Sequence, residues 1–288
     1  MDGIPMFIGA HVSTSGGVDK AIDRAQDIGA ECIQIFAASP RMWRVPPIKD
    51  KPLQSYHEKI VESSLGPTIV HAKYLTALGS PNPELVEKSR ASLTAELTET
   101  ERLGALGLVF HPASHRGAGL EAVFDHFVEG VNQVIENAPG KALLMLETSA
   151  GSGDHIGSKF EELGRLIKAI DNPRVATCFD TQHVWASGYD VVTKDGLDET
   201  MEEFDREIGL DLLRSVHAND SMRDRGSSVD RHDNIGEGLI GEEGFLNIMS
   251  HSAFADVPFY LEVPGYEKNG PDKPNVDALK TIREQASS

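Results

Sequence analysis

Eight short apolar runs alternate along this chain with longer segments of helical periodicity, and no other feature limits the fold as strongly. The runs, rich in Val, Ile, Leu and Phe, lie at residues 6–12, 32–38, 67–72, 106–112, 142–148, 175–181, 213–220 and 258–265. The segments between them repeat apolar residues at three- and four-residue steps, as at 18–29, 83–104, 120–139 and 159–171. Strands that alternate with helices pair in parallel, so the pattern predicts an α/β fold.

Eight strand–helix units close most naturally into a barrel, although an open doubly wound sheet also follows from alternation alone. The glycine pattern GxGxxG, which marks many dinucleotide-binding open sheets, does not follow the first run. The length of 288 residues suits one TIM barrel, a fold that needs about 250 residues. We therefore expect a single (β/α)8 TIM-barrel domain over residues 1–288.

Net charge and cysteine content limit the binding partners and the cellular compartment that we expect for the protein. The formal net charge is −18 at pH 7, and a chain this acidic repels a phosphate backbone at long range unless its positive charges are clustered. Two cysteines without CxxC spacing are too few for a disulfide framework, which indicates a reducing compartment. No basic N-terminal start precedes a long apolar core, and no run approaches about 18 apolar residues. We expect a cytoplasmic protein that does not enter a membrane.

Imidazole and carboxylate side chains stand at the carboxyl ends of six consecutive apolar runs, or in the segments that follow them. The nine residues are His71, His111, Glu147, Asp180, His183, His217, Asp230, His232 and Glu262. In a TIM barrel all these strand ends meet at the face that carries the active site. Independent structural histidines would scatter over helices and both strand ends, as His57, His126 and His251 do. The clustering predicts a metal centre at this rim.

The composition of this set indicates more than one ion. Imidazole and carboxylate together suit zinc, and also manganese or iron, and three or four protein ligands are normal for one ion. Nine candidates suffice for two or three ions if a carboxylate such as Glu147 bridges. A lone His is more often a structural residue than a ligand. A buried carboxylate such as Glu147 or Glu262, however, needs a cation or an Arg opposite it.

Other features of the same rim carry less weight. His11 ends the first run, and we expect it to hydrogen-bond to a ligand rather than to bind a metal itself. The glycine patterns GSG at 151–153 and GEG at 236–238 resemble phosphate cradles, but loop flexibility explains them as well. The irregular stretch 221–241 is too long for an ordinary connection, so it is a candidate functional loop.

Eight motifs follow one another in order along the chain: GAHVSTSGG, FAASPRMWR, HAKYL, ETSAGSG, FDTQHVWASGYD, HANDS, VDRHDNIGEGLIG and LEVPG. Together they resemble the endonuclease IV (deoxyribonuclease IV) family of bacteria and archaea, over essentially the whole chain. The family shares its fold with xylose isomerase-like barrels. Its members are zinc-dependent endonucleases of base excision repair that cut the phosphodiester bond 5′ to an abasic site. The resemblance implies this activity on double-stranded DNA, with a 3′-hydroxyl and a 5′-deoxyribose phosphate as the new ends.

By this resemblance the nine residues hold three zinc ions, with Mn²⁺ or Fe²⁺ as substitutes at some positions. The first ion would be bound by His71, His111 and Glu147. The second would be bound by Glu147, Asp180, His217 and Glu262. The third would be bound by His183, Asp230 and His232. Glu147 and Glu262 are implied as catalytic, the first because it bridges two ions and the second because it orients the nucleophile.

The resemblance also implies contacts with DNA. In the family, loops after the second and third strands enter the DNA at the lesion, and the matching residues are Arg41, Tyr74 and Leu75. An Arg and an aromatic side chain can stack on bases where a missing base has lowered the cost of extruding the nucleotide. Without the resemblance, Tyr74 reads as a half-buried rim aromatic and Arg41 as a solvated loop charge.

The distribution of charge suggests a DNA face on an acidic protein. Acidic runs fall in helical segments, whereas seven basic residues fall in loops after strands. These are Arg41, Arg44, Lys73, Arg116, Arg223, Arg225 and Arg231. We therefore expect a locally basic rim on an acidic body, and a monomer, because the rim must accept a duplex.

Four positions depart from the common family pattern: Met42, Thr148, Gln182 and Met222. None is an expected ligand, so they bear on substrate contacts and on the surroundings of the ligands rather than on the reaction.

One alternative to the nuclease is a sugar isomerase or epimerase, whose proton transfer needs one or two ions and a general base. Another is a catalytically silent scaffold or DNA-binding protein, which would keep the fold but lose ligands. Metal content discriminates, because the nuclease needs about three zinc ions and an isomerase one manganese or magnesium ion.

Overall fold

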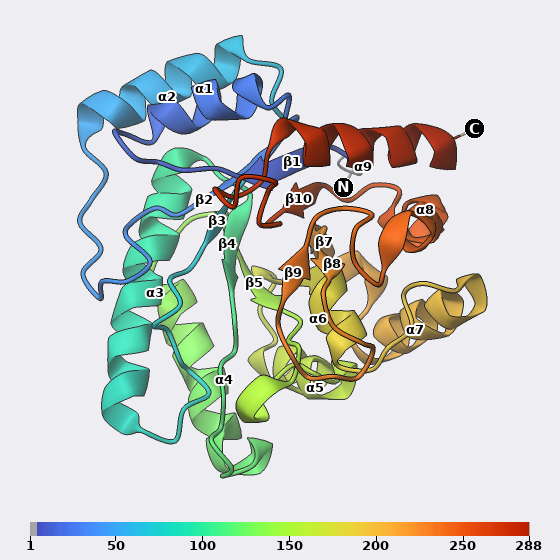
Figure 1. Ribbon diagram of the computed structural model, residues 1–288. Coiled ribbons are helices and arrows are strands. Elements are labelled where there is room, and N and C mark those ends of the chain that lie inside the picture. The colour runs from blue at the N-terminus through green and yellow to red at the C-terminus, as the bar shows by residue number, and fades with distance from the viewer. Residues whose placement is uncertain (1–4, 288) are drawn as a thin grey trace.

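Parallel pairing closes eight strands into a barrel in the computed structural model, which describes residues 5–287 (Figure 1). The order around the barrel is β1, β10, β7, β6, β5, β4, β3, β2, and its strands are β1 Ile8–His11, β2 Ile33–Ile35, β3 Thr68–His71, β4 Gly107–Phe110, β5 Leu143–Glu147, β6 Val175–Asp180, β7 Leu213–His217 and β10 Phe259–Leu261. The prediction of a TIM barrel from the strand–helix alternation is confirmed, and the open sheet is excluded.

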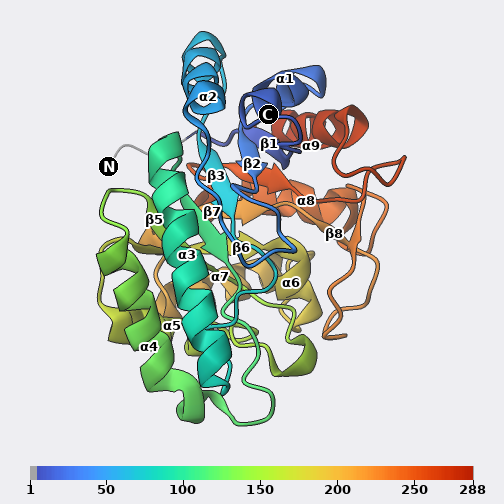
Figure 2. The same cartoon turned by 90° about the vertical axis from the view of Figure 1, so that its left-hand side faces the viewer.

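Helices surround the barrel in the order in which they follow the strands (Figures 1 and 2). The helices of this ring are α1 Asp19–Asp27, α2 Asp50–Glu62, α3 Pro83–Leu103, α4 Leu120–Asn137, α5 Phe160–Ile170, α7 Lys194–Glu207, α8 Gly241–Ser250 and α9 Lys273–Ala286. The short α6, Thr181–Ala186, lies at the end of β6 inside the ring. The longest, α3, begins where the Asn82 side chain accepts hydrogen bonds from Glu84 N and Leu85 N, and it ends at Gly104 in the left-handed region. No helix in residues 5–287 is long and apolar enough to span a membrane.

Alternation of side chains along the strands separates two apolar layers. Val70, Leu108, Phe110, Leu144 and Leu146 belong to the large core shared with the helices. Residues one position away belong to a second, smaller cluster that fills the barrel: Cys32, Ile69, Val109, Met145, Ala176, Cys178 and Tyr260. Both cysteines are free and buried, as expected for a chain without a disulfide framework.

The stretch 221–241 is partly ordered by a short antiparallel hairpin, which the sequence analysis did not predict. Strand β8 (Asp220–Ser221) pairs with β9 (His232–Asp233). The fully buried Asp220 carboxylate then organises the glycine-rich segment beyond the hairpin. It accepts hydrogen bonds from backbone N–H groups of Gly236, Gly238, Ile240 and Gly241 at 2.9–3.2 Å. The GEG pattern is thus a cradle for the protein's own carboxylate rather than for a phosphate.

Replacement of Asp220 tests this role. Asp220→Ala leaves several buried N–H groups without an acceptor, so we expect it to lower the free energy of unfolding by about 2–4 kcal/mol. Asp224→Ala, at an exposed position of the same loop, is the matched control and should change it by less than about 0.5 kcal/mol. Urea unfolding at equal metal loading measures both, and equal stability of the two variants would contradict the role.

Candidate metal centre

One side chain from each barrel strand, or from the residue after it, forms a polar layer at the carboxyl-end mouth of the barrel. Its members are His11, Gln34, His71, His111, Glu147, Asp180, His217 and Glu262. Six of the eight stand two positions after a residue of the apolar layer below, as His71 follows Ile69 and Glu147 follows Met145. The other two, His11 and His217, follow Gly9 and Ser215 in the same way. Side chains two apart share a face of a strand, so the barrel itself brings these groups together.

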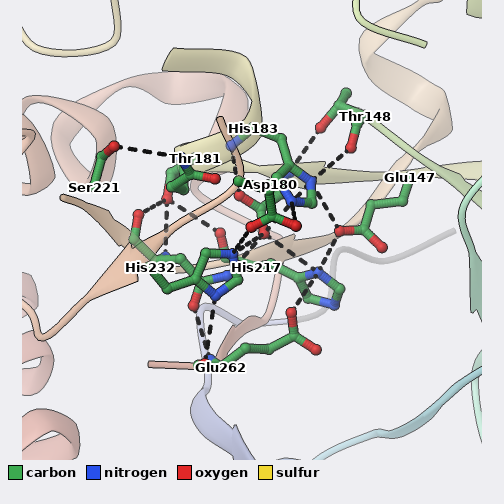
Figure 3. A network of polar contacts seen from close by, with 12 residues as sticks. Glu147, Thr148, Asp180, Thr181, His183, His217, Ser221, His232 and Glu262 are labelled. Carbon is green, nitrogen blue, oxygen red and sulfur yellow. Dashed lines mark hydrogen bonds and ion pairs between the residues drawn. The ribbon is translucent and has the colours of Figure 1, made fainter. Parts of the chain in front are cut away.

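Glu147 is fully buried, and dashed lines join its carboxylate to neighbouring imidazoles in Figure 3. Its Oε2 lies 3.2 Å from His71 Nε2 and 3.4 Å from His111 Nε2. Its Oε1 lies 3.0 Å from His217 Nδ1 and 3.2 Å from His183 Nδ1. The two oxygens thus face two different groups of imidazoles, which is the arrangement that a bridging carboxylate requires.

Asp180 and Glu262 complete the group on the Oε1 side of Glu147. Asp180 Oδ2 lies 3.7 Å from His217 Nδ1, and Glu262 Oε2 lies 3.5 Å from the same nitrogen. The other oxygen of Asp180, Oδ1, caps α6 by accepting from the backbone N–H of His183 at 2.8 Å. One carboxylate therefore fixes the start of α6 and faces the cluster at the same time. Ligand atoms of Glu147, Asp180, His217 and Glu262 lie within 4.8 Å of one another.

Asp230 and His232 approach from the hairpin loop toward His183. Asp230 Oδ2 lies 3.4 Å from His183 Nε2, and Asp230 Oδ1 lies 3.3 Å from His232 Nε2. The expected proximity of the two side chains in the Asp230-x-His232 segment is confirmed. Nε2 of His232 is buried and makes no hydrogen bond, so its lone pair is free to bind a cation. The Asp230 side chain is half exposed, which leaves this group open to solvent.

The outer nitrogens of the histidines are held by hydrogen bonds that leave the inner nitrogens for ligation. His71 Nδ1 donates to the carbonyl of Ala72 at 2.6 Å, and His183 Nδ1 donates to the carbonyl of Thr148 at 2.8 Å. A neutral imidazole has one N–H, so in the neutral ring each of these bonds leaves the lone pair on Nε2. Figure 3 shows His183 directed at Thr148. Such outer bonds orient metal-binding histidines in general.

The charge states of the cluster suit cation binding. Burial alone would raise the pKa of Glu147, but the imidazoles of His111 and His217 hold it well below its usual range. Burial would likewise raise the pKa of Asp230, but the hydrogen bond from His183 lowers it to about 2. Burial lowers the pKa of His111 to about 4. At neutral pH Glu147 and Asp230 are therefore ionised and His111 is neutral, which are the ligating forms. Burial would lower the pKa of His183, but Asp180 holds it well above its usual range, so a cation that binds this imidazole displaces a proton.

The donor set fits a group of divalent metal ions. Within residues 5–287, no ion pair joins Glu147, Asp180 or Glu262 to a Lys or Arg. Buried carboxylates without such a partner are costly, and clustered imidazole and carboxylate donors are the ligands that zinc, manganese and iron take. The structure thus brings eight of the nine sequence-predicted residues into three overlapping groups that share Glu147 and Asp180. The ninth, Asp230, lies beside His183 and His232 at 3.4 and 3.3 Å.

Comparison with known proteins places the chain in a family. A family model described as a xylose isomerase-like TIM barrel matches residues 22–285. A probable endonuclease 4 from Halothermothrix orenii is 41% identical over 279 residues, covering 96% of this chain and 99% of that protein. The chain belongs to the endonuclease IV family. A probable endonuclease 4 from Natronomonas pharaonis is 38% identical, covering 97% and 99% of the two chains.

The fold of the endonuclease IV family extends over nearly the whole chain. The crystal structure of endonuclease IV from Thermus thermophilus superposes with a TM-score of 0.85 at 33% sequence identity. The superposition covers 96% of this chain and 98% of that one. The architecture that carries the candidate metal centre is therefore the architecture of this family.

The three residues that the family resemblance assigns to DNA lie in the loops predicted for them. Tyr74 is 67% exposed, so the alternative interpretation of this residue as a half-buried rim aromatic does not hold. Its ring centroid lies 6.1 Å from that of His71, and Tyr74 borders two adjoining cavities of about 520 and 740 Å³. Leu75 lines the larger cavity. Arg41 is exposed in the loop between β2 and α2.

Lys73 does not belong to the basic rim, contrary to the sequence prediction. The side chain is buried, and its Nζ donates to the carbonyls of Met42 and Trp43 at 3.1 and 3.4 Å. Glu96 Oε1 lies 3.8 Å from the same ammonium. Lys73 therefore fastens the loop that carries Arg41 instead of facing solvent. The other six basic residues are exposed, and Arg225 is paired with Asp190 at 2.8 Å.

Buried amides around the cluster were missed by the sequence analysis. Asn219 donates from Nδ2 to Asp180 Oδ2 at 2.7 Å and accepts from Glu262 N at 2.9 Å. Gln34 contacts Glu262 and His217 in the polar layer. Gln182, a departure from the family pattern, donates to the carbonyl of Val229 at 2.9 Å and so fastens the loop that carries Asp230. His11 hydrogen-bonds with Gln34, consistent with the expected supporting role.

Addition of zinc tests the metal centre without any assay of activity. Ions that bind the folded chain alone stabilise it, by about 2.7 kcal/mol for one site at a hundredfold excess over its Kd. We therefore expect Zn²⁺ to raise the unfolding temperature of the metal-stripped protein. His111→Ala should reduce this shift, whereas His126→Ala, on α4 and outside the cluster, should preserve it. Calorimetry checks this, and an unchanged wild-type unfolding temperature would contradict a zinc centre.

Proposed function

We propose that this protein is a zinc-dependent apurinic/apyrimidinic endonuclease of base excision repair. It hydrolyses the phosphodiester bond 5′ to an abasic site in double-stranded DNA and leaves a 3′-hydroxyl and a 5′-deoxyribose phosphate. The observation that carries the proposal is the convergence of nine His, Asp and Glu side chains at the barrel mouth of a chain of the endonuclease IV family. The enzyme acts in the cytoplasm as a monomer whose barrel mouth is open to the duplex.

Under this proposal the centre would hold three zinc ions. The ligands of the first ion would be His71, His111 and Glu147. The ligands of the second would be Glu147, Asp180, His217 and Glu262. The ligands of the third would be His183, Asp230 and His232. Bound there, the ions would polarise phosphate oxygens, lower the pKa of water toward about 7 and neutralise charge on the attacking and leaving oxygens.

Glu147 and Glu262 have different tasks in the reaction. Glu147 is fully buried and faces imidazoles on both sides, so it holds the centre together. Glu262 is 18% exposed and lines the cavity at the barrel mouth, within reach of both the cluster and a substrate. Burial would raise the pKa of Glu262, but His217 and His11 hold it well below its usual range. As an ionised carboxylate at the cavity wall, Glu262 orients the attacking water and accepts a hydrogen bond from it.

Rim residues recognise the lesion. The exposed ring of Tyr74, together with Leu75 and Arg41, fills the space beside the extruded abasic nucleotide and stacks on neighbouring bases. Arg116 and Arg231 line the larger cavity and contact phosphates. The acidic runs lie apart from this face, on the outer helices α5 and α7.

The number of converging side chains separates this proposal from a sugar isomerase. Proton transfer in such an enzyme uses a set like Glu147, Asp180, His217 and Glu262, and gives the other candidates no task. Those others are His71, His111, His183, Asp230 and His232. Because they lie as close together as the first four, the geometry favours a multinuclear hydrolase. No candidate ligand is missing, which also disfavours a silent scaffold.

The role of Glu262 predicts a separation of catalysis from binding. Glu262→Gln keeps the size of the side chain but removes its charge, so we expect cleavage of an abasic duplex to fall below about one-thousandth of the wild-type rate. Affinity for the same duplex should stay within about threefold. Glu243→Gln, exposed on α8, is the matched control. Cleavage by Glu262→Gln at the wild-type rate would remove Glu262 from the mechanism.

Salt dependence tests the basic rim. Each phosphate contact on duplex DNA contributes about −0.9 to the slope of log K against log salt. We expect affinity for an abasic duplex to fall steeply between low and moderate salt, and Arg231→Ala to lower the magnitude of the slope by about one. Arg206→Ala on the outer helix α7 should leave the slope unchanged. Titrations by fluorescence anisotropy at several salt concentrations measure this slope. A wild-type affinity that does not change with salt would contradict a phosphate-binding rim.

A further inference from the structure

Gln34 is a fully buried amide in the polar layer at the barrel mouth, and it is not one of the nine candidate ligands. Its Oε1 lies 2.8 Å from His217 Nε2. Its Nε2 lies 2.5 Å from Glu262 Oε1 and 2.9 Å from His11 Nδ1. A side chain of β2 thus connects the last two strands of the barrel, through two candidate ligands of the same ion.

The neighbours of Gln34 fix the orientation of its amide. An ionised Glu262 carboxylate only accepts hydrogen bonds, so the amide NH₂ group must face it. The opposite orientation would place the carbonyl oxygen against a carboxylate oxygen at 2.5 Å, which is repulsive. The amide oxygen is therefore directed at His217, and it can only accept. It follows that His217 donates through Nε2–H.

We propose that Gln34 is a positioning residue of the metal centre, which holds His217 in the Nε2–H tautomer and fixes the Glu262 carboxylate beside it. With the proton on Nε2, the lone pair of His217 lies on Nδ1. This nitrogen faces Glu147 Oε1 at 3.0 Å, Glu262 Oε2 at 3.5 Å and Asp180 Oδ2 at 3.7 Å. The same amide therefore directs two of the four donors at one point.

The contact with His11 explains why the amide does not rotate. Nε2 of Gln34 has two protons, and Glu262 and His11 Nδ1 accept one each. The His11 ring is itself packed on Phe36, with ring centroids 4.4 Å apart. The amide oxygen and both N–H bonds of the Gln34 side chain thus have hydrogen-bond partners within the polar layer, as a buried amide requires. A residue placed in this way can set the tautomer of a ligand without touching the substrate.

The proposal rests on the proposed zinc centre but not on DNA cleavage, so the experiment measures zinc binding. Metal-stripped protein is titrated with Zn²⁺ against a chromophoric chelator, for wild type, Gln34→Met and Gln34→Glu. Supporting hydrogen bonds to metal ligands change affinity by about 10–100-fold. We expect Gln34→Met to weaken one of the bound zinc ions by this factor and to leave the others near wild-type affinity.

Gln34→Glu separates the two contacts of the amide. The new carboxylate still accepts from His217 but cannot donate to Glu262, and it adds a like charge beside Glu262. We expect this variant to keep the His217 tautomer and to lose zinc affinity through displacement of Glu262. Thr177→Val is the matched control, because Thr177 is a buried barrel residue whose hydroxyl donates to the Leu212 carbonyl rather than to a member of the cluster.

The tautomer itself is read by nitrogen-15 NMR of histidine-labelled, zinc-loaded protein. We expect a hydrogen-bonded Nε2–H signal of His217 in wild type, Gln34→Glu and Thr177→Val, and its loss or shift in Gln34→Met. Unchanged zinc affinity in Gln34→Met, or a wild-type His217 protonated at Nδ1, would overturn the positioning role. A merely structural role would lower stability in Gln34→Met and Thr177→Val alike without a selective loss of one zinc ion.

An assay of abasic-site cleavage on the same wild-type sample keeps the two proposals apart. Zinc binding and the His217 tautomer as expected, without cleavage of an abasic duplex, would leave the role of Gln34 supported and would overturn the proposed function. Cleavage together with unchanged zinc affinity in Gln34→Met would do the reverse. A wild-type chain that binds no zinc would overturn both.

Discussion

The buried charge of Glu147 is the constraint on which the mouth of this barrel depends. A carboxylate without solvent must be balanced, and its two oxygens here face four imidazoles rather than a Lys or Arg. A guanidinium would satisfy one carboxylate and close the site. Imidazoles with their outer nitrogens engaged elsewhere leave room for cations between them. The composition of the polar layer is therefore consistent with a metal centre. Without cations, the burial of these carboxylates would cost free energy of folding.

The strand period explains why the sequence predicted so much of this centre. An apolar residue inside a barrel strand is followed two positions later by a residue on the same face. The pairs Ile69 and His71, Met145 and Glu147, and Tyr260 and Glu262 follow this rule, so each ligand sits above a core residue. Local alternation thus fixes which side chains converge. The closed topology, which follows from eight repeats of the strand–helix unit, then brings them to one mouth.

The same period could have identified Gln34, two positions after Cys32, but an amide gives no metal-type signal. Lys73 was misplaced for a different reason. Its burial depends on Glu96 in α3 and on carbonyls of the preceding βα loop, which no local pattern encodes. The GEG cradle depends likewise on Asp220, about sixteen positions earlier, and the short hairpin on pairing across a loop. Contacts between distant segments are thus the part of the site that the sequence left open.

The burial of Lys73 has a consequence for how substrate recognition and the metal centre are related. His71 is the last residue of β3, and Lys73 and Tyr74 come directly after the strand. Lys73 fastens the neighbouring loop by hydrogen bonds to the carbonyls of Met42 and Trp43. The backbone that presents Arg41 is therefore tied to the strand that presents His71. A shift of this loop would have to break two hydrogen bonds to a buried ammonium or move the strand end with it. The side chains expected to probe DNA and those expected to hold the first ion thus share one rigid support.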